Sequence, residues 1–298
     1  MSYAAIAREK AALVERTGLL GEGLFGSQVV SRFFIEGFGT TEQRAAWSQR
    51  VVSVAISEPR VGAHPKLLTT RAEEVRNGFA IWGNKAWVTN GPLADVFVVL
   101  AITSIEDGRK RYSALLVPHD TPGLSIDEPP EYRALAPSRH CGLKLDGCRV
   151  PRSALLGVPG TAYETMAMPF RDVEDAVGTF GLLGAFRFML ARLAAHTEGE
   201  EATLALGRLG SLVAVFATTA DAVIAALDSG ELARQLDALV GLRLLAAEIR
   251  ERAREFGATG EAIERLLDDV DRSLSVAGAP RRARQLRLGQ QLIAAAER

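Results

Sequence analysis

The chain has little of the residue types that mark disulfide-rich and metal-binding proteins. Its 298 residues include two cysteines, Cys141 and Cys148, whose spacing fits neither a redox Cys-x-x-Cys motif nor a zinc ribbon. We expect both to be reduced packing residues of a cytoplasmic protein. The four histidines also lack metal-ligand spacing, so the sequence predicts no metal site.

The positive and negative charges of the chain are nearly balanced. The formal net charge is −1 at pH 7, and the basic residues are scattered among acidic ones. A nucleic-acid partner therefore has no basic patch to bind, and we expect none. The arginine-rich segment 280–287 is a local exception, and its apolar spacing is typical of the solvated face of a terminal helix.

Long apolar runs are absent from the sequence as well. No run approaches the roughly 20 residues that cross a membrane, and the first ten residues are polar and charged, unlike a signal peptide. We therefore expect a soluble, cytoplasmic protein without a membrane partner. With 48% hydrophobic residues, the chain has enough apolar content for one large or two modest domains.

The first part of the chain predicts a short helical segment, residues 1–50. Residues 4–20 have the apolar spacing of an amphipathic helix. Residues 21–26, Gly-Glu-Gly-Leu-Phe-Gly, match the dinucleotide fingerprint in form. That fingerprint works only between a strand and a helix, and here it follows a helix, so we exclude a nucleotide loop.

The rest of the chain divides into a strand-rich segment and a helical segment. Residues 51–157 hold short apolar runs separated by turn residues such as Asn77-Gly78, which predicts an antiparallel β-barrel. Residues 158–298 are mainly helical and predict an antiparallel bundle. Its helices are expected at about residues 172–196, 201–227, 231–256, 261–275 and 281–297. The fold class is therefore multi-domain, with α and β parts.

Two segments of the predicted barrel carry the most specific signal. Residues 53–64 read Ser-Val-Ala-Ile-Ser-Glu-Pro-Arg-Val-Gly-Ala-His, and residues 83–91 read Gly-Asn-Lys-Ala-Trp-Val-Thr-Asn-Gly, with Ala94-Asp95 close behind. Collinear matches lie around them, at residues 38–47, 112–118, 123–125 and 145–157. Over roughly residues 30–195 the chain resembles a shortened, divergent member of the acyl-CoA dehydrogenase family.

The resemblance implies an FAD site on these two segments. A flavin ring needs a flat apolar wall and a few hydrogen-bonding groups at its polar edge. Trp87 would supply the wall, with Thr89 and Ser57 supplying hydroxyls. The cofactor-binding residues implied are Ile56, Ser57, Trp87, Val88 and Thr89. The same pattern also occurs in ordinary barrel strands that run into a turn, so both interpretations remain open.

The catalytic base that the resemblance requires does not map cleanly. The family removes an α proton with a glutamate late in the helical domain, beside a Gly-Gly-x-Gly-Tyr segment that this sequence does not show. At the family's alternative location, Arg171 and Asp172 stand in transposed order, which moves the carboxylate by about 100° around the helix. Asp172 and Glu174 are the candidate bases, or ordinary acids near a helix start.

Two more positions depart from the family pattern. Where the family has an arginine for the flavin diphosphate, residues 194–203 have none and carry Glu198, Glu200 and Glu201, which would repel it. The family's Gly-Ser-Asp is replaced at its last two positions by Ala63 and His64. These are the candidate substrate-binding residues, with His64 either contacting a phosphate or simply solvated.

Two functions follow. The first is an FAD-dependent oxidoreductase acting on the CH–CH bond of an acyl-CoA thioester. The departures from the family pattern leave open that this member has lost its FAD. The second is a catalytically degenerate binding or structural subunit without flavin chemistry. The resemblance implies a homodimer or homotetramer, and an electron-transfer flavoprotein or a complete dehydrogenase as partner. A helix such as residues 201–227, apolar on more than one face, also needs a partner surface.

Overall fold

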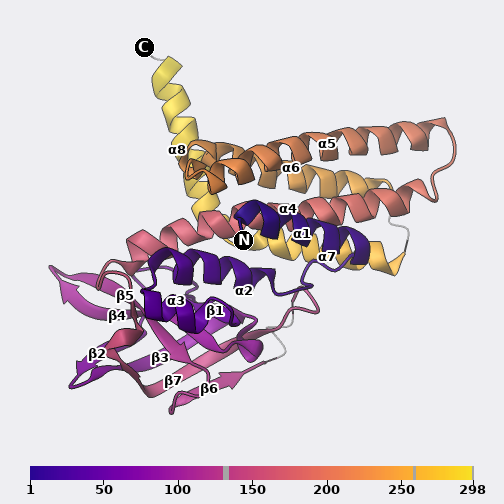
Figure 1. The fold of residues 1–298 in the computed structure, drawn as a ribbon. Coiled ribbons are helices and arrows are strands. Elements are labelled where there is room, and N and C mark those ends of the chain that lie inside the picture. The colour runs from indigo at the N-terminus through magenta and orange to yellow at the C-terminus, as the bar shows by residue number, and fades with distance from the viewer. Residues whose placement is uncertain (130–133, 258–259, 297–298) are drawn as a thin grey trace. The chain divides into compact units, whose positions relative to one another are not determined.

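The computed structural model describes residues 1–129, 134–257 and 260–296. They form two compact units, residues 24–174 and residues 1–23 with 175–298 (Figure 1). The first unit is built mainly of strands and the second of helices, which confirms the predicted multi-domain class. The division into residues 1–50, 51–157 and 158–298 stays a prediction.

Short helices open the strand-rich unit. They are α2 (Phe25–Val30), a π-helical turn (Ser31–Glu36) and α3 (Thr41–Trp47). Thr40 and Gln43 form a capping box at the start of α3, which explains where this helix begins. The buried Gln43 amide also donates to Ser153 O at 2.7 Å and Leu155 O at 2.9 Å, so it holds α3 against the end of the sheet.

Eight strands make one sheet in the order β6-β7-β3-β2-β4-β5-β8, with β1 paired to β4. Their bounds are β1 Val52–Ala55, β2 Arg71–Val75, β3 Gly78–Thr89, β4 Val96–Glu106, β5 Arg109–Pro118, β6 Leu124–Asp127, β7 His140–Pro151 and β8 Leu155–Leu156. The pairings of β4 with β1 and β2 are parallel, and the others are antiparallel.

The predicted antiparallel barrel is wrong in its closure. Among the described residues, the end strands β6 and β8 pair only with β7 and β5 respectively. They have four and two residues, so they offer too few ladder hydrogen bonds to close the sheet into a barrel. The sheet is open, and its long central strands β3, β4, β5 and β7 carry most of the core.

The helical unit is close to the expected bundle. Its helices are α1 (Tyr3–Thr17), the part of α4 (Met168–Ala194) from Asp175 onward, α5 (Glu200–Asp228), α6 (Leu236–Glu255), α7 (Glu261–Ser275) and α8 (Gly278–Ala296). Gly184 lets α4 lie close to α1, since a Cβ there would stand 2.3 Å from Ala11 O. Residue 297, where the last helix was expected to end, lies outside the described residues.

Two helical stretches, Tyr163–Ala194 and Glu200–Asp228, are long and apolar enough to cross a membrane. This corrects the expectation that no segment approaches such a length, which counted only uninterrupted apolar runs. In the first stretch 72% of the apolar window is buried, as in the core helix of a globular protein, against 33% in the second. The second, α5, therefore keeps exposed apolar surface.

Candidate functional site

Trp87 and Thr89 lie exposed at the end of β3, beside the start of β7. The Trp87 side chain is 50% exposed, whereas Val88 between them is fully buried. His140 of β7 contacts both: its Nδ1 is hydrogen-bonded to Thr89 Oγ1 at 3.2 Å, and its ring lies edge-on to the Trp87 ring, with 6.2 Å between centroids. An accessible indole face with a hydroxyl and an imidazole beside it is thus present on this edge of the sheet.

A bulge in β3 produces this exposure. Lys85 pairs with Leu143 and Val88 with Cys141, so Ala86 and Trp87 together face the single residue Gly142. Trp87 adopts a φ of 58°, a left-handed backbone conformation that bulky residues rarely take. Bulges re-aim side chains, and this one turns the indole away from the core that Val88 enters.

The second predicted segment lies against the first. Ala86 N donates to Ser57 O at 2.9 Å, and Lys85 Nζ donates to Ile56 O at 3.0 Å. Ser57, which is half-buried, is therefore held beside the residue that precedes Trp87. The structure brings Ile56, Ser57, Trp87, Val88 and Thr89 into one neighbourhood, although their role toward a cofactor stays a prediction.

A buried ion pair between two residues outside the predicted site, Glu58 and Lys85, holds that neighbourhood together. Lys85 Nζ lies 3.2 Å from Glu58 Oε1. The Glu58 carboxylate also accepts hydrogen bonds from Thr69 N, Thr69 Oγ1 and Thr70 N, each at 2.8 Å. The carboxylate thus has four donors, which is the saturation that a buried charge needs. The sequence signal for this buried pair was a lysine in the middle of a mostly apolar strand.

Each member of the pair perturbs the other. Burial alone would raise the pKa of Glu58, but the charge of Lys85 and the hydrogen bonds from Thr70 and Thr69 outweigh it and lower this pKa to about 2. Burial lowers the pKa of Lys85 to about 8, although the charge of Glu58 and its hydrogen bond act in the opposite direction. At neutral pH both groups are charged.

His140 was not among the predicted site residues. Burial lowers its pKa below the usual 6.5, against a hydrogen bond with the backbone of Ala134 that raises it. Its imidazole is therefore neutral at pH 7 and can either donate to Thr89 or accept from it. The sequence signal was weak, because His140 is far from the Trp87 motif along the chain.

The candidate substrate residues lie on an exposed turn. Ala63 and His64 follow Gly62, whose carbonyl accepts from Glu58 N at 2.9 Å. Ala63 O accepts a hydrogen bond from the Tyr163 hydroxyl at 3.3 Å, and the His64 side chain is exposed. Neither residue supplies a side-chain hydroxyl, so the imidazole of His64 is the one polar side chain that this pair offers to a ligand.

The candidate bases lie on α4. Asp172 is half-buried, with its Oδ1 3.9 Å from Arg171 Nε, and Glu174 is exposed. Because α4 begins at Met168, both residues lie beyond its first turn. Both carboxylates therefore lie on the same helix two residues apart, and the choice between them stays a prediction.

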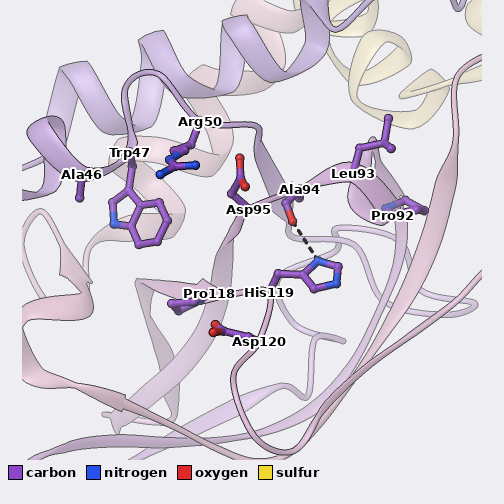
Figure 2. A pocket seen from close by; sticks show the side chains of 10 residues that line it. All are labelled: Ala46, Trp47, Arg50, Pro92, Leu93, Ala94, Asp95, Pro118, His119 and Asp120. Carbon is purple, nitrogen blue, oxygen red and sulfur yellow. Dashed lines mark hydrogen bonds between the residues drawn. The ribbon is translucent and has the colours of Figure 1, made fainter.

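A cavity of about 730 Å³ lies elsewhere on the same unit (Figure 2). Its lining residues are Ala46, Trp47, Arg50, Pro92, Leu93, Ala94, Asp95, Pro118, His119 and Asp120. Asp95 Oδ2 accepts from Val51 N at 2.8 Å, and His119 Nδ1 donates to Ala94 O at 2.9 Å. These polar groups hold the loops together, and none of the sequence-predicted site residues lines the cavity.

Comparison with known proteins shows which family the strand-rich part of the chain resembles. The family model "Acyl-CoA dehydrogenase, middle domain" matches residues 53–148. The chain is 35% identical over 140 residues to a mitochondrial isovaleryl-CoA dehydrogenase of Oryza sativa subsp. japonica, covering 46% of this chain and 34% of that protein. It is 32% identical over 142 residues to the mitochondrial short-chain specific acyl-CoA dehydrogenase of Rattus norvegicus, with the same two shares. The match thus spans about a third of each relative's length.

Solved structures share the fold over a longer stretch. An acyl-CoA dehydrogenase from Geobacillus kaustophilus has a TM-score of 0.82 at 22% identity and covers 96% of this chain and 83% of that one. A glutaryl-CoA dehydrogenase from Mycobacterium smegmatis has a TM-score of 0.70 at 26% identity, covering 92% and 84%. The likeness therefore includes the helices as well as the sheet.

Proposed function

Because this chain belongs to the acyl-CoA dehydrogenase family, we propose that it is an FAD-binding oxidoreductase acting on the CH–CH bond of an acyl-CoA thioester. The half-exposed Trp87, with Thr89 and His140 beside it, is the observation that carries the proposal. An exposed indole face is available for offset stacking, and a flavin ring is flat enough to lie against it. FAD would supply the hydride-accepting chemistry when bound.

Several residues would hold the ring. Trp87 would lie against its face, Thr89 and Ser57 would offer hydroxyls at its polar edge, and Ile56 and Val88 would complete the backbone around it. The buried Glu58–Lys85 pair holds the two segments together, since Lys85 Nζ also donates to Ile56 O. The side chains present therefore fit the flavin-ring end of the cofactor.

The substrate-binding residues and the catalytic base are proposed from the family resemblance rather than from contacts in the structure. Ala63 and His64 would face the CoA part of an acyl-CoA thioester. Asp172 or Glu174 would take the α proton, which requires an ionised carboxylate within hydrogen-bond reach of that carbon's proton. The electron-transfer flavoprotein of the family's usual chemistry is the proposed electron acceptor, and the cytoplasm the proposed location.

Spectroscopy and turnover test the proposal together. We expect the purified chain to bind FAD with a flavin absorbance spectrum, and a short-chain acyl-CoA to bleach that spectrum in the absence of oxygen. Glu174→Gln and Asp172→Asn separate the candidate bases, since the correct one abolishes bleaching while FAD stays bound. A protein that binds FAD tightly but is bleached by no acyl-CoA would contradict the catalytic part alone.

One observation favours the alternative of a binding or structural subunit without flavin chemistry. Glu198, Glu200 and Glu201 are exposed in the segment where the family has its diphosphate-binding arginine. Their charges oppose the cofactor's diphosphate. A chain that takes up no FAD but co-purifies with a complete dehydrogenase would support this second function.

We also propose that the chain forms a homodimer, or a homotetramer built from it. Leu204 and Val215 of α5 are 54% and 57% exposed, and they lie three helical turns apart on one face. Exposed Ser211 and Ala222 continue this face, and small side chains allow a second helix to approach closely. The apolar exposure of α5 would then be covered by the same helix of a second copy.

A further inference from the structure

Two arginines share one carboxylate inside the helical unit. Asp175 lies on α4, Arg243 on α6 and Arg281 near the start of α8. Arg243 Nη2 donates to Asp175 Oδ1 at 2.6 Å, and Arg281 Nη1 lies 4.0 Å from Asp175 Oδ2. The three side chains are 8%, 17% and 13% exposed for Arg243, Asp175 and Arg281 respectively. The cluster is therefore nearly enclosed, and Asp175 and Arg281 keep larger exposed fractions than Arg243.

Hydrogen bonding leaves several donors in this cluster unused. Arg243 Nε, Arg243 Nη1 and Arg281 Nη1 are buried and have no hydrogen-bond partner among the described residues. Arg281 Nη2 donates to the backbone carbonyl of Leu274. Guanidinium groups are rarely buried without partners for their N–H groups, because water is lost and nothing replaces it. Here the unused donors belong to two neighbouring guanidiniums.

Charge is unbalanced at the same place. Both guanidiniums are charged at any physiological pH, and Asp175 is the one carboxylate within ion-pair distance of either of them in the described part of the chain. The cluster thus has an excess positive charge. Burial and the charge of Arg243 lower the pKa of Arg281, while Asp175 raises it. A buried cation with unused donors is the condition under which an anion binds.

We propose that Arg243 and Arg281 form a binding site for a small oxyanion, the carboxylate or phosphate group of a ligand. The planar guanidinium fork presents paired N–H donors that match the oxygens of such a group. The ligand would take the donors that Asp175 leaves unused and balance the excess charge. Asp175 accepts one hydrogen bond from Arg243 and offsets one of the two positive charges, so its loss would leave the arginines with a larger excess charge. The site uses none of the residues proposed for the flavin, the substrate or the base.

Thermal unfolding and calorimetry test this with phosphate and acetate as probes, at constant ionic strength kept with chloride. We expect at least one probe to raise Tm with increasing concentration and to give a saturable calorimetric isotherm. Arg281→Gln should weaken binding about tenfold or more, because it removes one charged fork. Arg287→Gln on the same helix is the matched control, since Arg287 is exposed, and it should bind as the wild type does.

Two further variants keep the test decisive if Arg281→Gln folds poorly. Arg281→Lys keeps the charge but loses the fork, and should bind more weakly than the wild type. Asp175→Asn increases the excess positive charge, so its Tm should rise more steeply with the anion than that of the wild type. A response to phosphate alone identifies a phosphate-bearing ligand, and a response to acetate identifies a carboxylate. No saturable response to either probe, or an equal response in Arg281→Gln, overturns the proposal.

Discussion

Lys85 Nζ lies 3.2 Å from Glu58 Oε1, and these side chains are 0% and 4% exposed. This contact joins the middle of β3 to the segment that carries Ile56 and Ser57, because the same ammonium binds Ile56 O. The pair therefore positions the two segments that the family resemblance assigns to the flavin ring. Its removal is expected to affect stability first and cofactor binding as a consequence.

We predict that Lys85→Met destabilises the protein by about 3 to 5 kcal/mol, because it leaves the Glu58 carboxylate buried without its counter-charge. The double variant Glu58→Gln with Lys85→Met should lose less, since no unpaired charge remains. Urea unfolding of the four proteins of this cycle measures the coupling. Lys144→Met is the control: its side chain is 65% exposed, 3.9 Å from Asp146, and should cost about 1 kcal/mol or less. Additive losses would contradict the coupling.

Acid should remove the contribution of Glu58. Its pKa is lowered from 4.5 to about 2 on folding, so the unfolded chain binds more protons between these values and stability falls as pH falls through them. The contribution is fully present above about pH 5 and amounts to about 3 kcal/mol at most. Unfolding free energies measured from pH 6 to pH 2 should fall less steeply in Glu58→Gln. An unchanged slope would show that Glu58 titrates normally.

The sequence was sufficient for the fold class and for the approximate helices and strands, because their periodicity and turn residues are local signals. It was insufficient for sheet closure, since closure depends on whether the short strands β6 and β8 meet. It also did not identify the contacts of Trp87 with His140, or of Lys85 with Glu58. Those contacts join residues far apart in the sequence, and each depends on a strand register that no local pattern specifies.

For Trp87 the sequence predicted the exposed face but not the backbone conformation. Simple alternation along β3 predicts that Trp87 and Thr89 share a face, and both are indeed exposed. The bulge at Ala86 and Trp87 and the positive φ of Trp87 were not predictable, because they arise from pairing with Gly142 on β7. Two candidate bases remain for a different reason: with Arg171 and Asp172 transposed, Asp172 and Glu174 are two carboxylates of the same chemical type that no local pattern distinguishes.

The exposed face of α5 predicts self-association. Val215→Asp places a charge on a side chain that is 57% exposed, so the monomer should fold normally while a dimer through this face loses its apolar contact. Light scattering should show a dimer mass for the wild type and a monomer mass for Val215→Asp. Ala262→Asp adds the same carboxylate at an exposed position of α7 and should remain dimeric. A wild-type monomer at micromolar concentration would contradict the proposed assembly.

The flavin ring gives the last prediction. Trp87→Ala should weaken FAD binding more than Thr89→Val does, because it removes the wall of the site, whereas Thr89→Val removes one hydrogen bond of about 0.5 to 1.5 kcal/mol. Since Trp87 is 50% exposed, its truncation should cost only about 1 kcal/mol of stability. Trp82→Ala is the matched control on β3: Trp82 packs under Arg71, with 5.2 Å from its guanidinium carbon to the ring centroid, so its loss should leave FAD affinity unchanged. Thermal melts with and without FAD separate the two effects.

If FAD shifts none of the melts and Trp87→Ala unfolds far below the wild type, Trp87 is a packing residue and the flavin site has been lost from this chain.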